Sequence, residues 1–438
     1  MADLQSKQAT GRLFFIDVTR SISILLMLEG HFIVMWLDQQ FKDKDEWAYS
    51  IFAGIRGNTA PLFLTITGVV FMYLLERKGS EVYNSERVNK GLIRVATLLG
   101  WAYLVQINFR TIAKNTGTWT EEWKAFTQEC HYNPFSYFTH LVGDRFYTFH
   151  ILHCIAIGLL LTIGIYVLAH VIKKMHYVPH LLLGSAIACI FMQPLIVQYY
   201  DTHTHLPFLP DILNNFFGGE HSVFGIFPFC GYVLGGAFIG SLIARGFDAT
   251  SKHGLRTLLI AAISLIIIQA LFRFSFDAVL SHFMDKPIRF FRLMDSFFLR
   301  FSLSLVLVMG VILATRNKTS INKTLLAVGQ NTLPIFIVHL LVLYGAVSGF
   351  GLDTILTTVN PQDLEEYRQP WITIFFAVLF IGVFVFFAAR IDQLTELYRK
   401  FCNTLFFQPK SKSPLTNFKA MSGMLVIGCI LYQVISRI

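Results

Sequence analysis

Residues 12–38 read RLFFIDVTRSISILLMLEGHFIVMWLD, and this stretch decides how the rest of the chain is interpreted. It is long and apolar enough to cross a lipid bilayer, yet it contains Asp17, Arg20, Glu29 and His31. Ionisable groups inside a spanning helix are costly, so they usually face a protein interior or a wet cavity and mark a functional site. The stretch therefore predicts a membrane-spanning helix with a functional face.

Arg20 and His31 lie on the same face of this predicted helix. They are eleven residues apart, which corresponds to about three turns, a rise of roughly 16 Å and an angular offset of about 20°. Asp17 precedes Arg20 by three residues and is placed to pair with it. A buried Asp17–Arg20 pair that only fixes helix packing is the alternative, but the shared face favours a site with groups at two depths.

The composition is that of a polytopic membrane protein. The 438 residues are 54% hydrophobic and only 14% charged, whereas soluble domains carry about a quarter charged residues. The polar start MADLQSKQAT indicates no cleavable signal peptide. The six cysteines include no CxxC pair, which excludes a metal-ribbon or redox motif. We expect a lipid bilayer and no nucleic acid as partner, because the net charge of +9 follows the membrane topology.

The apolar runs predict an all-α polytopic helix bundle of eleven spans in a single domain, residues 1–438. The predicted spans are 14–37, 59–75, 92–109, 150–172, 180–199, 224–244, 255–272, 297–315, 332–350, 371–389 and 421–436. Most basic residues fall in segments that face the cytoplasm if the N-terminus does, and the outer segment 200–223 has none. This distribution predicts an inside N-terminus and an outside C-terminus. The oligomeric state is left open.

Three features of these segments have specific interpretations. Gly231, Gly235, Gly236 and Gly240 recur at four-residue spacing, which lets helix backbones approach closely and predicts packing. The outer stretch 273–296 is basic, against the orientation rule, and indicates either noise or a patch for an anionic substrate. The long outer loops are 110–149 and 200–223. His203 and His205 in the second loop alternate like metal ligands, but without a recognisable third ligand a solvated loop is favoured.

Several polar groups are predicted to converge in the outer half of the bundle. His31 lies toward the outer end of the first span, Asn58 begins the second, and His339 lies in the outer half of the ninth. His150 and His153 open the fourth span and share a face because they are three residues apart. Any one of them alone is readily explained as a core residue. Their convergence at one depth predicts a cavity.

A cluster of cations is predicted at the cytoplasmic side, next to the first span. The segment ERKGSEVYNSERVNKGLIR, residues 76–94, has five cations in nineteen residues, among them Arg77, Arg87, Lys90 and Arg94. Such a cluster near a helix start suits phosphate groups, and ordinary positive-inside bias is the alternative. The chain has no P-loop, GxGxxG, GxSxG or HExxH motif, so these nucleotide-binding, hydrolase and zinc-protease interpretations lack support.

Arg20 and His31 form R-x10-H, as in the membrane acyltransferase-3 family. The segments that extend this similarity are IDVTRSISILLMLEGH, NTAPLFLTITGVVF, FHILHCIAIGLLL, FPFCGYVLGGAFIG and NTLPIFIVHLLVLYG. Together they resemble the bacterial branch of the heparan-alpha-glucosaminide N-acetyltransferase catalytic-domain family, which belongs to the same superfamily. The resemblance covers about nine of the eleven predicted spans, in order and spacing.

The resemblance implies transfer of an acetyl group from cytoplasmic acetyl-CoA to a sugar across the bacterial inner membrane. It places Arg20 and His31 at the acyl-donor site, with His31 as general base or acyl-positioning group. The lysosomal enzymes have Asn at the His31 position and a functional His in the first outer loop, whereas residues 38–57 contain no His. The resemblance therefore does not extend to a heparan substrate or to an acetyl-histidine relay in that loop.

The residues themselves suit this chemistry. A histidine near neutral pH serves as base toward a hydroxyl or amine, and Asn58, His153 or His339 is placed to stabilise the developing oxyanion. Arg77, Arg87, Lys90 and Arg94 are the expected phosphate ligands, with Arg20 holding the pantetheine or ordering the cavity. No metal is expected. The alternative functions are a secondary transporter or flippase for a lipid-linked or small polar substrate, and a receptor without enzymatic activity.

Overall fold

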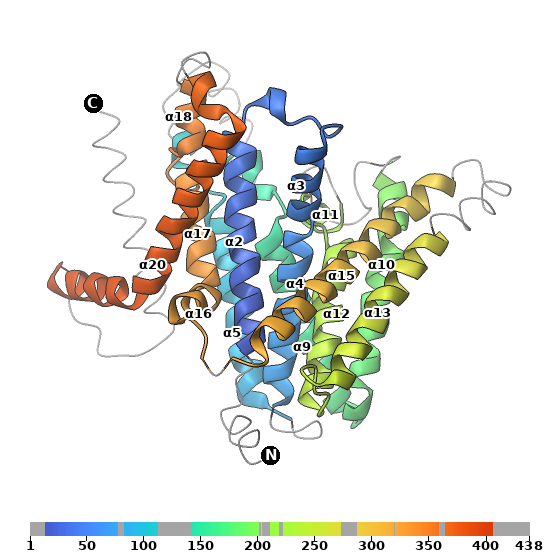
Figure 1. The fold of residues 1–438 in the computed structure, drawn as a ribbon. Helices are drawn as coiled ribbons and strands as arrows, with labels where there is room; N and C mark the ends of the chain where they lie inside the picture. The colour runs from blue at the N-terminus through green and yellow to red at the C-terminus, as the bar shows by residue number, and fades with distance from the viewer. Residues whose placement is uncertain are drawn as a thin grey trace, which may run out of the picture. The chain divides into compact units, whose positions relative to one another are not determined.

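The computed structural model describes residues 14–77, 83–112, 142–200, 203, 211–218, 222–272, 287–318, 320–358 and 364–405. In these ranges the regular elements are helices and there is no β-strand, which confirms the predicted all-α class (Figure 1). The α-helices are α2 (Phe14–Trp36), α3 (Trp47–Gly57), α4 (Thr59–Glu76), α5 (Ser85–Leu104), α9 (Ile151–Val171), α10 (Val178–Tyr200), α11 (Asp211–Phe217), α12 (Ile226–Ala244), α13 (Lys252–Leu271), α15 (Pro287–Thr315), α16 (Lys323–Gln330), α17 (Thr332–Tyr344), α18 (Leu352–Thr358) and α20 (Pro370–Leu405). The 3₁₀ helices are η1 (Gln39–Phe41), η3 (Asp144–Tyr147), η4 (Met175–Tyr177) and η6 (Glu365–Arg368).

Eight helices of the described chain are long and apolar enough to cross a membrane, or nine if the broken pair α16 and α17 counts as one span. Of the eleven predicted spans, 421–436 lies outside the described residues. The predicted span 92–109 falls on α5, which begins seven residues earlier and is not among the eight. The predicted span 332–350 is shortened because α17 ends at Tyr344, where Gly345 adopts the left-handed conformation at φ 60°.

The chain divides into two compact units. The first comprises Met1–Met27, Trp47–Ala102 and Tyr147–Gln330. The second comprises Leu28–Glu46, Tyr103–Phe146 and Asn331–Ile438. Within α2, Arg20 therefore belongs to the first unit and His31 to the second.

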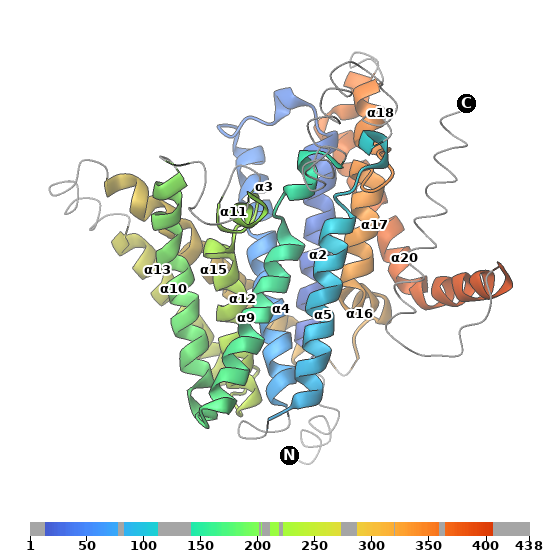
Figure 2. The same ribbon diagram turned by 180° about the vertical axis from the view of Figure 1, so that it is seen from behind.

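The core of the first unit forms around α4 and α12, and α12 also packs against α9 and α10 (Figure 2). A side chain added at Gly236 would overlap the backbone carbonyl of Thr65, and one at Gly240 would overlap that of Val69. A side chain at Gly68 of α4 would meet the α12 backbone in the same way. The four-residue glycine spacing on α12 thus has the predicted packing role, and helix contact here is backbone against backbone.

Gly236→Ala is expected to destabilise the protein by about 1–3 kcal/mol, the usual cost of inserting atoms into a close-packed interior. A backbone carbonyl cannot rotate away as a flexible side chain does, so α4 and α12 have to separate. The measurement is thermal unfolding in detergent. Gly310→Ala on α15 is the matched control, because no atom lies within 4 Å of the added group. Equal unfolding temperatures for the two variants would contradict the close approach.

A buried ion pair joins three elements at one end of the first unit. Glu76, the last residue of α4, is fully buried. Arg245, which caps α12, donates to both of its carboxylate oxygens, from Nη2 at 2.7 Å and from Nε at 3.3 Å. Ser241 donates to the same carboxylate, and Nη2 of Arg245 also donates to the carbonyl of Met175 at 2.8 Å. The end of α4, the end of α12 and the turn before α10 therefore meet.

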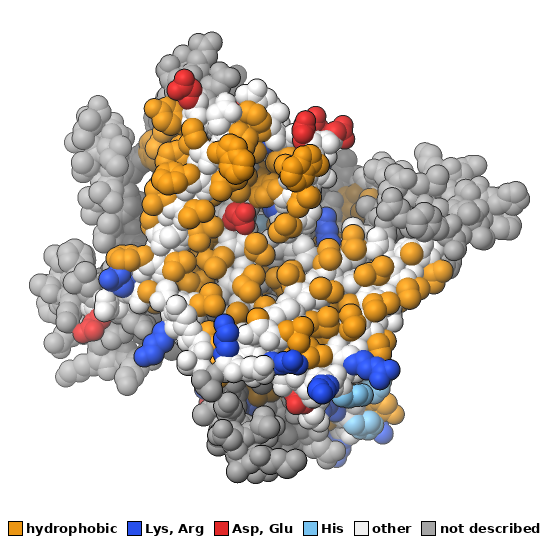
Figure 3. Space-filling view, viewed as in Figure 1, with side chains coloured by type: hydrophobic (Ala, Val, Ile, Leu, Met, Phe, Trp, Pro, Cys, Tyr) orange, Lys and Arg blue, Asp and Glu red, His pale blue; other side chains and the backbone are white. Residues whose placement is uncertain are grey.

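Basic side chains of the first unit gather at this same end. Figure 3 shows hydrophobic side chains over the exposed face of α13 and α15, with Lys and Arg along the edge where α13 begins and α15 ends. Exposed leucine and isoleucine side chains, such as Ile260, Ile267 and Leu303, cover that face. An apolar face bordered by cations is typical of a helix in contact with lipid. The basic end is the one predicted to face the cytoplasm.

Candidate functional site

His31, Tyr344 and His339 form a cluster in the second unit. His31 Nδ1 lies 2.9 Å from the hydroxyl of Tyr344, within hydrogen-bond distance. The ring centroids of His31 and His339 are 5.2 Å apart. His31 comes from α2, and the other two residues come from α17. The structure thus brings together two of the histidines predicted to converge, and it adds a tyrosine hydroxyl that the sequence interpretation missed.

The position of His31 is fixed by anchors at the end of α2. The indole of Trp36 donates to the carbonyl of Tyr367 at 2.9 Å, and Arg368 Nε donates back to the carbonyl of Trp36 at 3.0 Å. Arg368 also pairs with Asp38 at 3.4 Å. These contacts tie the C-terminal end of α2 to η6, and His31 lies between one and two turns before that end.

The end of α17 is held in a similar way. Gly345 closes the helix, and Phe109 N–H donates to the carbonyl of Val347 at 2.9 Å just beyond it. The guanidinium of Arg110 lies 5.4 Å from the ring centre of Phe350. The residues that follow Tyr344, the last residue of α17, are therefore held in place by these contacts. Both partners of the His31–Tyr344 contact sit on restrained helix ends.

His339 is the most buried member of the cluster. It has no exposed surface, and neither ring nitrogen has a hydrogen-bond partner among the described residues. Phe336, three residues earlier on α17, packs on it with ring centroids 5.0 Å apart. A buried imidazole without partners is costly, and its contact with His31 makes simultaneous protonation of the two rings unfavourable because like charges repel.

Arg20 occupies a different environment, in the first unit. It is half-buried, and it experiences the charges of both Asp17 on its own helix and Arg94 on α5. The start of α2 is fixed by α16, since Ser21 donates to the carbonyl of Leu325. Asp17 offsets part of the repulsion between the two guanidinium groups, and a further anion beside them would offset more of it. Of the predicted cation cluster, Arg94 is thus the member whose charge acts on Arg20.

The other predicted phosphate ligands have wholly or partly exposed side chains. Arg77 is exposed just after α4, and Arg87 is partly exposed on the first turns of α5. Lys90 forms an exposed ion pair with Glu86 at 2.5 Å, of a type that contributes little to stability. These cations are wholly or partly exposed, as is Arg94, and Arg94 is the member whose charge acts on Arg20.

His150 and His153 are brought together as a cap at the start of α9. His150 Nδ1 accepts a hydrogen bond from the Leu152 N–H at 3.2 Å, and His153 Nδ1 accepts one from the His150 N–H at 3.3 Å. His150 Nε2 lies 3.1 Å from the carbonyl of Ala102, so it donates there. These contacts satisfy orphan N–H groups of the first turn. They give both residues a structural role, and His153 as a catalytic group stays a prediction.

Asn58 precedes α4 without capping it. Its side chain makes no cap hydrogen bond, is 5% exposed, and has no partner for either amide atom among the described residues. An asparagine at this position normally accepts a hydrogen bond from the first turn. Here the amide is buried and available for another ligand. The predicted loop features His205, 113–141 and 273–286 lie outside the described residues.

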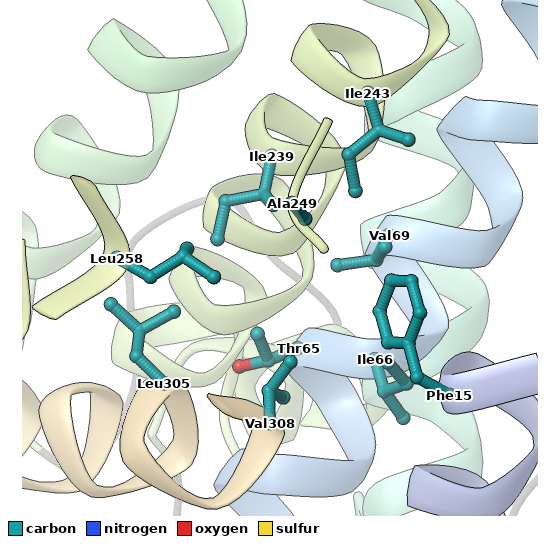
Figure 4. A pocket seen from close by; sticks show the side chains of 10 residues that line it. All are labelled: Phe15, Thr65, Ile66, Val69, Ile239, Ile243, Ala249, Leu258, Leu305 and Val308. Atoms are coloured by element: carbon teal, nitrogen blue, oxygen red, sulfur yellow. The ribbon is translucent and has the colours of Figure 1, made fainter. Parts of the chain in front are cut away.

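The pocket in the first unit has a different character (Figure 4). It is a small hollow of about 20 Å³, lined by apolar side chains such as Phe15, Val69 and Leu258. Thr65 is its polar lining residue, and the Thr65 hydroxyl has no hydrogen-bond partner among the described residues. No titratable side chain lines it, so it offers no group for proton transfer or phosphate binding. The titratable candidates therefore lie elsewhere, around His31 in the second unit and around Arg20 in the first.

Comparison with known proteins agrees with the pattern on α2. The model of the acyltransferase-3 family, described as an acyltransferase domain, matches residues 13–391. No curated protein and no solved structure gave a match. The matched region contains α2 with Arg20 and His31, the cation-bearing helix α5 and the histidine-bearing helix α17. The chain therefore belongs to the acyltransferase-3 family and is an integral membrane acyltransferase.

Proposed function

We propose that this membrane acyltransferase moves an acetyl group from acetyl-CoA, bound from the cytoplasm, to a hydroxyl or amine of a carbohydrate on the outer face. The observation that carries the proposal is the contact of His31 with Tyr344. His31 lies on α2, the helix that also bears Arg20. A histidine oriented by a second polar group is the usual arrangement of a general base.

The tautomer of His31 decides what the cluster can do. With its proton on Nδ1, His31 donates to Tyr344 and its Nε2 is the base. Nε2 then takes the proton of the acceptor hydroxyl or amine while the acceptor atom attacks the thioester carbonyl. The tetrahedral intermediate collapses by breaking the carbon–sulfur bond, and the proton passes from His31 to the departing CoA thiolate. No covalent acyl-enzyme is required.

Arg20 and Arg94 are the proposed donor-binding pair. The donor carries phosphate groups, and guanidinium groups bind phosphate through short charge-assisted hydrogen bonds. An anion between Arg20 and Arg94 would relieve their repulsion. Arg77, Arg87 and Lys90 are accessible and would contribute longer-range attraction that depends on ionic strength.

The activity is tested with purified protein in detergent, labelled acetyl-CoA, and a panel of amino and hydroxy sugars that includes glucosaminides. The expected product is one acetylated sugar per CoA released. Other acyl donors in parallel reactions test the choice of donor. A transporter or flippase would instead move the sugar across proteoliposomes without CoA, and that result without any acyl product would overturn the proposal.

Arg94→Gln is expected to lower the apparent affinity for CoA by roughly tenfold or more, because one charge-assisted contact is lost. The affinity is measured from the protection that CoA gives against thermal unfolding. The difference from wild type should shrink as salt is raised. Arg20→Gln should weaken protection similarly and also abolish transfer.

Lys318→Gln is the matched control for these variants, since Lys318 is exposed at the end of α15 on the same basic end of the first unit. Equal protection in Arg94→Gln and Lys318→Gln would remove Arg94 from the donor site.

A further inference from the structure

Arg300 is a cation within a membrane-spanning helix that the acyl-transfer mechanism does not use. It is the fifth residue of the span Ser296–Thr315 in α15, roughly 6 Å from the start of that span. It is half-buried, and within the described residues no carboxylate pairs with it. A charged side chain at such a position is expensive unless it meets a partner, water or a ligand.

The guanidinium of Arg300 lies against the break between α3 and α4. Its Nη2 is 3.7 Å from the point where a Cβ on Gly57 would stand. The next residue is Asn58, whose buried amide has no partner among the described residues, and the hydroxyl of Thr59 is likewise buried and unsatisfied there. Arg300, for which the described residues supply no counter-ion, thus lies next to Gly57, and the two residues that follow Gly57 have buried polar atoms with no partner among the described residues.

The other side chains around this cation are aromatic. The phenol of Tyr232 on α12 is close enough to experience the charge of Arg300. The ring of Tyr232 stacks on Phe297 with centroids 4.2 Å apart. Fixed charges act strongly beside such low-dielectric walls. The cluster therefore has one positive group, unsatisfied amide and hydroxyl groups, and an aromatic side.

The depth of this cluster is set by helices of the first unit. Asn58 precedes the first residue of α4, and the last residue, Glu76, lies at the basic end. The distance along the helix between them is roughly 27 Å. Arg300 is likewise about four turns before Arg316, which follows α15 at the basic end. The cluster is therefore in the half of the unit that lies away from the predicted cytoplasmic end.

We propose that Arg300, together with the Asn58 amide that follows Gly57 in the chain, binds a carboxylate or phosphate group carried by the acyl acceptor. This inference rests on the proposed transfer to an outer carbohydrate and defines its acceptor class as acidic. A planar guanidinium recognises these anions through paired N–H donors, and the amide NH₂ supplies another. A neutral sugar would leave the charge unpaired. A phospholipid headgroup offers the same anionic chemistry and is the rival source.

The test is thermal unfolding of the purified full chain in nanodiscs of phosphatidylcholine, titrated with glucuronate, glucose 6-phosphate or glucose. We expect the two anions to stabilise wild type and glucose to have no effect. In Arg300→Gln the apparent affinity for the anions should fall by roughly 10- to 100-fold. Arg300→Lys, which keeps the charge but not the fork, should lie between them, as should Asn58→Ala. Arg56→Gln, an exposed cation one residue before Gly57, should match wild type.

Three results would overturn the proposal: an equal response of wild type and Arg300→Gln to the anions, no response of wild type to either anion, or stabilisation by phosphatidylglycerol that replaces the response to sugar acids. The last result would identify a lipid headgroup as the anion. If Arg300→Gln does not fold, Arg300→Lys and Asn58→Ala provide the same comparison. These binding measurements contain no acetyl-CoA, so failure to transfer acetyl groups to any sugar would count only against the proposed activity.

Discussion

Replacing His31 by alanine is expected to lower the rate of acetyl transfer by about 10²- to 10⁴-fold, the usual contribution of a positioned general base. The acceptor proton then has no base in the cluster, because His339 is fully buried behind His31. Protection of the protein by CoA should be unchanged, since Arg20 and Arg94 are retained. Single-turnover rates with labelled acetyl-CoA measure the loss. Normal turnover in His31→Ala would exclude His31 from the mechanism.

Tyr344→Phe separates orientation of the imidazole from proton transfer. It removes only the hydroxyl that lies 2.9 Å from His31 Nδ1, so the base remains while its preferred tautomer is lost. The loss of rate should be smaller than in His31→Ala, and the pH dependence of the rate should shift. Tyr367→Phe is the matched control, because Tyr367 is exposed and contacts Trp36 through its backbone carbonyl. A pH profile identical to wild type in Tyr344→Phe would limit Tyr344 to packing.

The fold class and the long apolar helix α2 were predictable because they depend on local patterns. Hydropathy over about twenty residues defines a membrane helix, and the spacing of Arg20 and His31 depends only on helix geometry. The packing role of Gly236 and Gly240 was predictable for the same reason. Each of these features is contained within one helix.

Pairing between helices was not predictable in this way. Tyr344 has no signal in the sequence beyond being a tyrosine at the end of an apolar run, and its role appears only when α17 is placed beside His31. Asn58 was recognised as a polar group at a helix start. Arg300 adjoins that position from a helix more than two hundred residues later in the chain. The predicted span 92–109 begins seven residues after α5 does, because the cations at the start of α5 reduce its hydropathy without shortening the helix.

The pairing of Glu76 with Arg245 was likewise not predictable from the sequence. Its loss has the largest expected effect on stability. In the sequence it is the first letter of a basic segment, while the structure makes it the buried partner of Arg245. Glu76→Ala is expected to destabilise the first unit by about 3–5 kcal/mol, because it leaves the largely buried guanidinium without its counter-charge. Thermal or denaturant unfolding in detergent measures the loss. Glu86→Ala removes an exposed helix pair with Lys90 and should cost only about 0.3–0.5 kcal/mol.

The double variant Glu76→Leu with Arg245→Met distinguishes a missing partner from a missing contact area. Replacing both members of a buried ion pair by apolar groups of similar size is often neutral, whereas removing one is costly. The double variant should therefore recover most of the stability lost in Glu76→Leu alone. Recovery would show that this ion pair selects which helix ends meet and adds little net stability of its own. Additive losses in the two single variants would instead mean that each side chain stabilises the fold through separate contacts, such as the one from Arg245 to Met175.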